Sequence, residues 1–273
     1  KVSLEKKVRL VTRNTCSEFS PKERGLYVIV GVPPDIEGEE TYEERQDVAD
    51  AIANKGFNVM EVDCHWPRDK YVWFNNSYVH SHPYYDEGGC FVFGKNYFVA
   101  SADKDIYWDY RIRRVKKMDT IEQRIKDIHS TDFYMIPSLR RRGCDPEIHL
   151  DLSISIIESR GIMLVDSRHY RQQKRIFEKI AYERNQKVIS VNSEDEAKLW
   201  PMNILILEHR GKTTAVANEN CKKVLKVLNK YDIDIITVPI NHLPSLGGSI
   251  RCITNTVECL SVYNKIKGSV EKC

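Results

Sequence analysis

Cys252 stands in a setting that suits a nucleophile, at the end of the segment Gly247–Cys252, which reads Gly-Gly-Ser-Ile-Arg-Cys. A glycine pair lets the backbone turn sharply and approach a ligand closely. Far upstream, His149 and Asp151 are two residues apart, which on a strand places both side chains on the same face. One cysteine with a remote histidine and carboxylate predicts a nucleophilic thiol assisted by a base and by a group that orients the base.

Apolar residues after the cysteine recur at Ile253, Val257 and Leu260. This spacing marks one face of a helix and predicts that the chain enters a buried element there. The thiol would then stand where a glycine turn meets buried structure, and could face a pocket.

The composition describes an ordinary soluble chain of 273 residues, 41% hydrophobic and 30% charged, with a net charge of +3. This balance favours neither a nucleic-acid surface nor a membrane surface. Two basic clusters, at 111–117 and 140–142, are expected to be solvated, although the second could also bind an anionic substrate. No stretch approaches the ~20 apolar residues of a membrane-spanning helix.

Eight cysteines are scattered without Cys-x-x-Cys pairs, which disfavours a zinc site and a disulfide scaffold. We therefore expect a reducing compartment, the cytoplasm, and no bound metal. The sequence begins without Met and without an apolar signal core, so a removed targeting segment is left open. A homo-oligomer is also left open.

A pattern of helix, strand, loop, strand, turn and strand recurs along the chain. Helices are expected at 42–55, 120–126, 170–184 and 220–230, followed by strands at 57–62, 132–136, 187–191 and 234–238. Strand pairs are expected at 71–74 with 77–81, 149–156 with 161–167, and 203–207 with 213–218. A further pair at 89–93 with 96–101 and an opening strand at 25–30 complete the series.

Repeated units that cannot bury their own apolar faces must pack against one another. About five such α/β units favour a closed ring, and residues 1–273 are expected to form one domain. A doubly wound parallel sheet is the alternative, but the tight strand pairs resemble hairpins and suit it poorly.

A ring brings equivalent loops together near its axis. The polar loop residues include one thiol, one imidazole and three carboxylates: Asp69, Glu87, His149, Asp151 and Cys252. Two carboxylates beyond the needs of a Cys-His pair imply a cationic substrate. A planar guanidinium, with N–H donors in fixed directions, matches two carboxylates well.

Four segments follow one another in order: Arg68–Asp69, Glu87–Gly89, His149–Asp151 and Gly247–Cys252. Together they resemble the loops of the guanidine-modifying enzyme superfamily. Its members include arginine deiminase, agmatine deiminase, dimethylarginine dimethylaminohydrolase and arginine:glycine amidinotransferase. The resemblance implies the pentein fold, a fivefold pseudosymmetric α/β propeller of β-β-α-β units around a central active site, and it implies no cofactor.

Residue by residue, the resemblance implies that Cys252 attacks the guanidinium carbon and forms a covalent amidino-thioether. His149 would protonate the leaving amine and then deprotonate water, with Glu87 holding its ring. Asp69 and Asp151 would bind the guanidinium nitrogens. The neighbouring cations, Arg68 and Arg251, are counted with the substrate-binding residues.

Three positions depart from the family pattern. Arg251 stands where several relatives have His, Cys90 where deiminases often have Asp, and Asp86 precedes Glu87. Arg251 could favour the thiolate or bind a substrate carboxylate, a role for which 140–142 also qualifies. Each motif alone has a plain explanation, as a strand histidine or a turn carboxylate. The order in which the four motifs follow one another favours a functional site.

The expected activity is hydrolysis of arginine or a related guanidine to a ureido product. An amidinotransferase, which passes the same intermediate to an acceptor amine, is the alternative, and a non-catalytic ribosome-binding pentein is a third. Asp151 can accept hydrogen bonds from unsubstituted N–H groups, which a methylated nitrogen would displace. The sequence therefore favours a substrate other than dimethylarginine.

Overall fold

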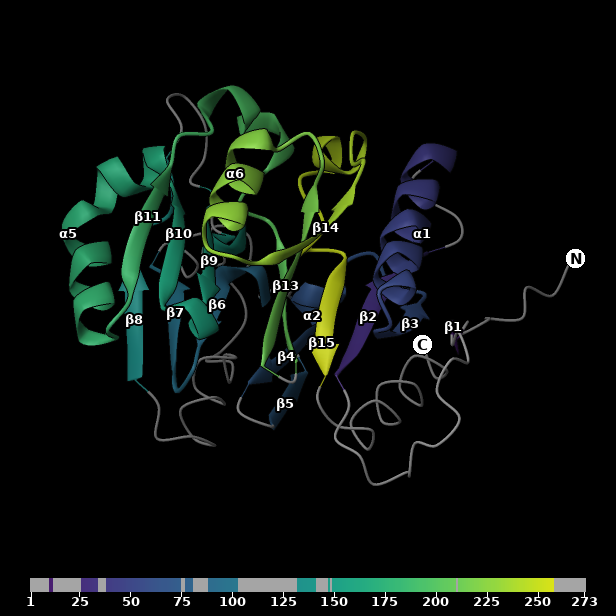
Figure 1. Ribbon diagram of the computed structural model, residues 1–273, viewed down its shortest axis with the longest axis horizontal. Helices are drawn as coiled ribbons and strands as arrows, with labels where there is room; N and C mark the ends of the chain where they lie inside the picture. Colours follow the sequence, from purple (N-terminus) through teal and green to yellow (C-terminus); the bar gives the residue numbers. More distant parts are fainter. Residues whose placement is uncertain are drawn as a thin grey trace, which may run out of the picture.

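The computed structural model of the 273-residue chain describes residues 10–11, 26–33, 38–74, 77–80, 88–102, 132–140, 147, 149–209 and 211–257. These residues form five small sheets with helices packed around them (Figure 1). The expected helix at 120–126 and the basic cluster at 111–117 lie outside the described residues.

Three sheets share one plan, in which an antiparallel hairpin is followed by a strand parallel to its second member. The first consists of β6 (Phe91–Gly94), β7 (Tyr97–Ser101) and β8 (Asp132–Ile136). The second consists of β9 (Ile154–Ile157), β10 (Ile162–Asp166), helix α5 (Ser167–Glu183) and β11 (Lys187–Val191). The third consists of β12 (Leu205–His209), β13 (Lys212–Asn218), helix α6 (Lys222–Lys230) and β14 (Asp234–Val238).

The two ends of the chain build a fourth sheet of the same plan together. Strand β15 (Thr254–Val257) pairs antiparallel with β2 (Tyr27–Gly31), and helix α1 (Glu39–Asn54) leads to β3 (Asn58–Val62), parallel to β2. The short strand β1 (Leu10–Val11) adds to the edge of β3. The fifth sheet is the hairpin of β4 (Tyr71–Phe74) and β5 (Ser77–His80).

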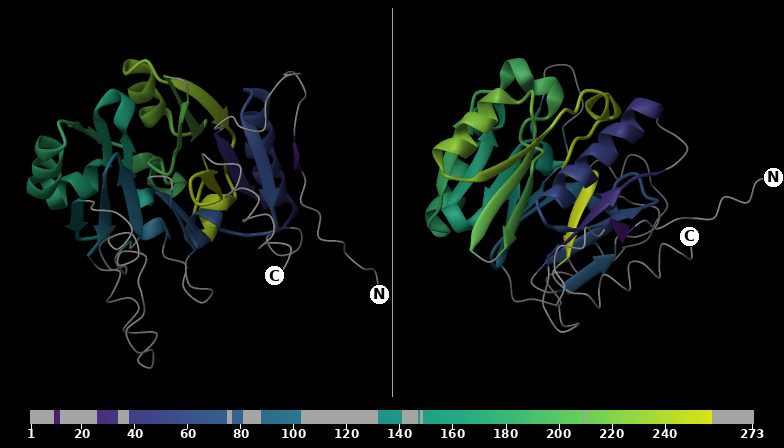
Figure 2. Two further views of the ribbon diagram at one scale, coloured as in Figure 1. Left: turned by 90° about the horizontal axis from the view of Figure 1, so that it is seen from below. Right: turned by 45° about the vertical axis from the view of Figure 1, so that its right-hand side comes forward.

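The first strand of each unit lies at the inside of the ring. Strand β6 contacts β9, and β15 contacts both β12 and β4. Figures 1 and 2 show α1, α5 and α6 at the periphery and these strands toward the middle. The repeat and the ring predicted from the sequence are confirmed.

Apolar cores fill the space between neighbouring units. Helix α1 packs Val48 and Ile52 against Val30 of β2 and Ile236 of β14, which belongs to the preceding unit. A second core joins residues of β10, β12, β13 and α6, and a third joins β7, β9, β10 and α5. Each sheet therefore buries its faces only with the help of its neighbours, as expected for a repeat structure.

Short helical turns connect the outer parts of the units to the inner strands. They are α2 (Pro67–Lys70), η1 (Gly88–Cys90), η2 (Leu150–Leu152), η4 (Glu194–Leu199) and η5 (Leu243–Leu246). A further turn, η3 (Glu158–Arg160), lies within the hairpin of β9 and β10. Among the described residues, no helix is both long and apolar enough to cross a membrane.

Two local predictions were wrong. The residues after Cys252 form strand β15, because Thr254, Thr256 and Val257 are β-branched and pair with β2. His149 and Asp151 do not share a strand face, since the chain makes the 3-10 turn η2 before β9 begins at Ile154. In the segment after Cys252, a short apolar pattern allowed either periodicity, and pairing with β2 decided it.

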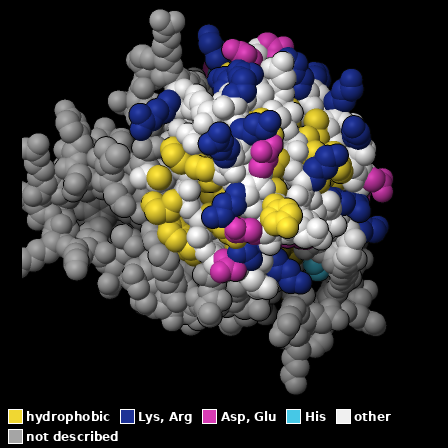
Figure 3. Space-filling view, turned by 90° about the vertical axis from the view of Figure 1, so that its left-hand side faces the viewer, with side chains coloured by type: hydrophobic (Ala, Val, Ile, Leu, Met, Phe, Trp, Pro, Cys, Tyr) yellow, Lys and Arg dark blue, Asp and Glu magenta, His cyan; other side chains and the backbone are white. Residues whose placement is uncertain are grey.

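The face of the molecule formed by α5 carries charges of both signs (Figure 3). Lys174 pairs with Glu178 at 3.7 Å and Lys179 with Glu183 at 3.8 Å, one helical turn apart. On the described part of this face, basic side chains are interspersed with acidic ones and do not form one continuous patch.

Gly31, the last residue of β2, contacts both the segment before β15 and the loop after β3. Its N–H donates to the carbonyl of Ile253 at 2.8 Å, and a Cβ here would lie 2.1 Å from the carbonyl oxygen of Cys64. Gly31→Ala therefore forces backbone apart, and we expect the melting temperature to fall by roughly 2–8 °C. Thermal unfolding checks this, with the exposed Ser190→Ala as control; an unchanged melting temperature contradicts the packing described.

Candidate active site

The loops that precede the inner strands meet at one end of the ring. Turn α2 contacts η1 and β15, and η1 contacts η2. A glycine pair makes this approach possible: a Cβ on Gly88 would lie 1.9 Å from the carbonyl oxygen of Arg68. A Cβ on Gly89 would lie 2.8 Å from Nδ1 of His149 and 2.9 Å from Oδ1 of Asp69. The imidazole and the carboxylate therefore lie against the same glycine.

Asp69 is held by the loop of the next unit. It is 4% exposed, and its Oδ1 accepts a hydrogen bond from the backbone N–H of Gly89 at 2.7 Å. This bond fixes the carboxylate beside His149 and leaves Oδ2 for another donor.

Asp151 is a buried carboxylate, 4% exposed, and neither of its oxygens has a hydrogen-bond partner among the described residues. Its nearest cation is Arg68, whose Nε lies 3.6 Å from Oδ2. Burial raises the pKa of Asp151 to about 6, although the charges of Arg68 and His149 act in the opposite direction. The group is thus placed to accept N–H donors from a cation.

Arg68 is fixed by contacts other than this ion pair. Its Nη2 donates to the carbonyl of Phe91, and its guanidinium lies 5.3 Å from the ring centroid of Phe93. The cation–π contact and the hydrogen bond hold the side chain across the axis of the ring. Arg68 is therefore positioned to balance the charge of Asp151.

His149 is partly buried at the start of turn η2. Burial acts to lower its pKa, but the negative charges of Asp69, Asp151 and Glu147 together raise the pKa above its ordinary value. An imidazole in this setting takes up a proton readily near neutral pH, which suits a group that must both accept and return one.

Cys252 is 3% exposed. Burial, followed by the charges of Asp151 and Asp69, raises the pKa of its thiol well above the ordinary value. The amide of Asn203 contacts it twice: Nδ2 donates to Sγ at 3.3 Å, and Oδ1 accepts from the Cys252 N–H at 3.2 Å. The resting thiol is neutral and needs an added positive charge nearby to ionise.

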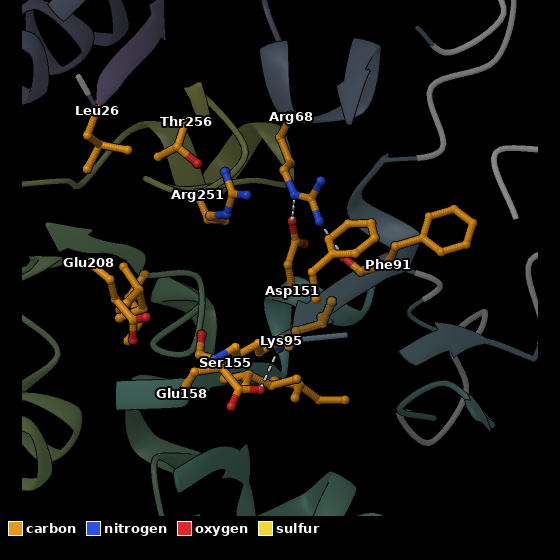
Figure 4. A pocket seen from close by; sticks show the side chains of 17 residues that line it. Leu26, Arg68, Phe91, Lys95, Asp151, Ser155, Glu158, Glu208, Arg251 and Thr256 are labelled. Atoms are coloured by element: carbon orange, nitrogen blue, oxygen red, sulfur yellow. Dashed lines mark hydrogen bonds and ion pairs between the residues drawn. The ribbon is translucent and has the colours of Figure 1, made fainter. Parts of the chain in front are cut away.

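Arg251 is bound to the backbone of the segment that follows Cys252. Its Nη1 donates to the carbonyl of Thr254 at 2.9 Å. Burial, and then the charge of Arg68, lower the pKa of Arg251 to about 9. With Arg68 and Asp151 it lies at one side of a cavity of about 330 Å³, with Lys95 and Glu158 at the other (Figure 4).

This cavity lies along the inner strands. Residues of β6, β9, β12 and β15 line it, whereas Cys252 and His149 are not among its lining residues. Arg68, Asp151 and Arg251 therefore belong both to the cluster around Cys252 and to the wall of this cavity.

The structure brings together six of the seven residues predicted from the sequence: Arg68, Asp69, His149, Asp151, Arg251 and Cys252. Glu87 lies outside the described residues, immediately before η1. Of the basic cluster at 140–142, Arg140 is exposed and the other two positions are not described. No group of three His, Cys, Asp or Glu suited to a metal ion occurs among the described residues.

Asn203 was missed by the sequence analysis. It lies in the loop before β12, the place in its unit that corresponds to His149–Asp151 before β9. The signal that could have found it was the repeat itself, since four loops carried candidate residues and the loop of this unit carried none.

Comparison with known proteins agrees with the fold. Among solved structures, the chain is similar to SxtG, an amidinotransferase from Microseira wollei in the saxitoxin biosynthetic pathway, with 13% identity and a TM-score of 0.61 over 85% of this chain and 94% of that one. It is also similar to DDAH from Pseudomonas aeruginosa complexed with citrulline, with 10% identity and a TM-score of 0.60 over 85% and 98%. For agmatine deiminase from C. jejuni the values are 13%, 0.56, 86% and 94%.

These likenesses show that the fold is the pentein fold, as the motifs predicted. The family model described as "N,N dimethylarginine dimethylhydrolase, eukaryotic" matches residues 73–259, and the chain belongs to this family of guanidino-group-modifying enzymes. No protein of curated function matches the chain by sequence.

The raised pKa of Asp151 predicts a specific dependence of stability on pH. Because its pKa is about 6 in the folded chain and 3.8 ordinarily, the folded state holds this proton more tightly. The stabilisation that this bound proton gives to the folded state is therefore complete below pH ~4. It is lost as pH rises through 6, by about 1 kcal/mol between pH 5 and 7. Asp151→Asn removes this titration. Urea unfolding at both pH values should show a difference between parent and variant that changes by that amount; a constant difference contradicts it.

Proposed function

We propose that the protein is a hydrolase that attacks the guanidinium carbon of arginine or a related guanidine through a covalent intermediate on Cys252. The observation that carries this proposal is Asp151, a buried carboxylate whose two oxygens lack hydrogen-bond partners among the described residues. Asp69 lies close by, and both carboxylates act on the pKa of Cys252. A planar cation between them would satisfy these oxygens and bring its carbon to the sulfur.

Binding of a guanidinium also prepares the nucleophile. The thiol is neutral at rest because burial and two carboxylates oppose its ionisation. A bound cation offsets those negative charges and removes water, so the pKa of the Cys252 thiol falls when substrate is present. His149, beside Asp69, accepts the thiol proton and becomes an imidazolium.

The reaction then proceeds in two halves. The thiolate adds to the guanidinium carbon, and the tetrahedral species breaks its C–N bond as His149 gives its proton to the leaving amine or ammonia. The product of this half is an amidino-thioether on Cys252. His149, now neutral, takes a proton from a water molecule as the water oxygen adds to the same carbon. Collapse breaks the C–S bond, restores the thiol and releases a ureido product.

Of the substrate-binding roles expected from the sequence, we propose that Asp69 keeps its own, whereas Arg68 acts indirectly. Asp69 would accept from guanidinium nitrogens through Oδ2, while Arg68 holds Asp151 in place. For Arg251, the contact with Thr254 and its position in the wall of the cavity favour a role in balancing the charge of Asp151. Glu87, next to η1, is proposed to orient His149.

We further propose that residues 1–273 act as one catalytic domain, because β15 and β2 close the ring with strands from both ends. Of the four described cysteines, all of which are buried, Cys221 and Cys252 carry free thiols. This agrees with a reducing compartment, proposed to be the cytoplasm.

The covalent intermediate is open to direct test. Acid quench of the protein with arginine, followed by mass spectrometry, should find an amidino adduct on Cys252, and Cys252→Ala should lower turnover by roughly 10,000-fold. Cys221→Ala is the matched control, because burial also raises the pKa of Cys221, to about 12, in a core away from the site. Absence of any adduct with arginine, agmatine and methylated arginines would falsify the mechanism.

The same assay separates hydrolysis from transfer, which the similarity to an amidinotransferase makes necessary. Citrulline formed without an added amine supports hydrolysis. Ornithine formed only in the presence of an acceptor such as glycine supports an amidinotransferase. If no guanidine is turned over and Cys252→Ala has no effect in the assay, the result favours a non-catalytic binding function.

The choice of substrate follows from the two oxygens of Asp151, which lack hydrogen-bond partners among the described residues. Replacing the N–H groups of one guanidinium nitrogen by methyl groups removes donors from a buried carboxylate, at a cost of about 1.5–3 kcal/mol. We therefore expect kcat/KM for arginine to exceed that for N,N-dimethylarginine by about 10- to 100-fold. Release of ammonia or dimethylamine measures both. Preference for the dimethylated substrate would instead give this chain the activity named by its family.

A further inference from the structure

Asn203 is bound to both halves of the candidate site. It is 2% exposed, and its Nδ2 lies 3.3 Å from Sγ of Cys252 and 3.2 Å from the backbone carbonyl of Asp151. Its Oδ1 accepts from the N–H of Cys252 at 3.2 Å, and its own carbonyl accepts from the N–H of Arg251 at 3.3 Å. All four interactions join this residue to loops of the two neighbouring units.

The place of Asn203 in the ring explains how one residue reaches both loops. It stands directly before the inner strand β12, between the units that contribute β9 and β15. The turn before β9 carries Asp151, and the turn before β15 carries Cys252. An amide at this position can present its donor to the sulfur and its acceptor to the backbone of the nucleophile loop at once.

The sulfur is otherwise surrounded by groups that oppose a negative charge. Burial and the carboxylates of Asp151 and Asp69 all disfavour the thiolate. The Asn203 amide opposes them by donating a hydrogen bond to the sulfur, which becomes stronger when the sulfur is charged. Because Oδ1 is occupied by the Cys252 N–H, the amide is oriented with its NH2 group toward Sγ.

We infer that Asn203 is a positioning residue for the nucleophile: its Nδ2 donates to the Cys252 thiolate and holds the sulfur in a fixed place relative to Asp151. The shared donor links the position of the sulfur to the turn η2, which carries Asp151. This inference rests on Cys252 being the nucleophile, but it concerns the ionisation of the thiol, which can be measured without any guanidine.

The test is the rate of alkylation of Cys252 by iodoacetamide between pH 7 and 11, read by mass spectrometry of the Cys252 peptide. Asn203→Asp keeps the shape and the Oδ1 acceptor, loses the donor and adds a negative charge. A lost hydrogen bond to a charged group corresponds to about 1–2 pH units. We expect the profile to move by that amount to higher pH, so that alkylation at pH 8 slows about 10- to 100-fold. Asn203→Ala, which only removes the amide, should move it in the same direction.

Asn218 supplies a matched control. It is 3% exposed, its Nδ2 donates to the carbonyl of Ile240 at 2.6 Å, and its Oδ1 accepts from the N–H of Asn220 at 3.0 Å. Asn218→Asp disturbs the same kind of buried amide without touching Cys252, so it should lower the melting temperature and leave the alkylation profile in place.

Three outcomes overturn the inference. One is that folded Asn203→Asp and Asn203→Ala keep the parent profile. Another is that Asn218→Asp shifts the profile as much as they do. The third is that neither Asn203 variant folds while Asn218→Asp does, which would make Asn203 a packing residue. A shifted profile with no guanidine turnover would support the role of Asn203 and count against the proposed function alone.

Discussion

The burial of negative charge on the axis of the ring is the constraint on which the rest of the structure depends. Asp151 is nearly inaccessible, has no hydrogen bond to either oxygen among the described residues, and has Arg68 as its nearest described cation, at 3.6 Å. Such a carboxylate is costly to keep ionised, as its pKa of about 6 reflects. Only a rigid surrounding structure can hold it in place without relaxing toward water.

The ring provides that rigidity by making each loop depend on the next. Asp69 is held by the Gly89 N–H, Cys252 by the Asn203 amide, and Arg68 by the Phe91 carbonyl. Each of these bonds joins different units. A site assembled in this way is preorganised, because no single loop can move without breaking contacts to its neighbours.

Much of this arrangement could be predicted from the sequence, and the remainder could not for physical reasons. The residue types and order of Asp69, His149, Asp151 and Cys252 were sufficient to predict a thiol, a base and a paired carboxylate site. The strand β15 was mispredicted because a few apolar residues fit two periodicities, and the choice depends on β2, more than 200 residues away in the sequence. The turn η2 was mispredicted for a local reason, since the N–H of Leu152 bonds to the carbonyl of His149. Asn203 could not be singled out as a site residue by its type alone, since an asparagine has no distinctive chemistry until the sulfur beside it is known.

Closure of the ring by β15 and β2 also determines when the site can exist during synthesis. The proposed nucleophile, Cys252, lies just before β15, so it leaves the ribosome after the other loops that surround it. Pairing of Thr254 with Val30 joins residues from opposite ends of the chain, a contact of the kind that forms late in folding. A nascent chain can therefore form the loops that carry Asp69 and Asp151 before Cys252 has been synthesised. The proposed active site is complete only when the ring has closed.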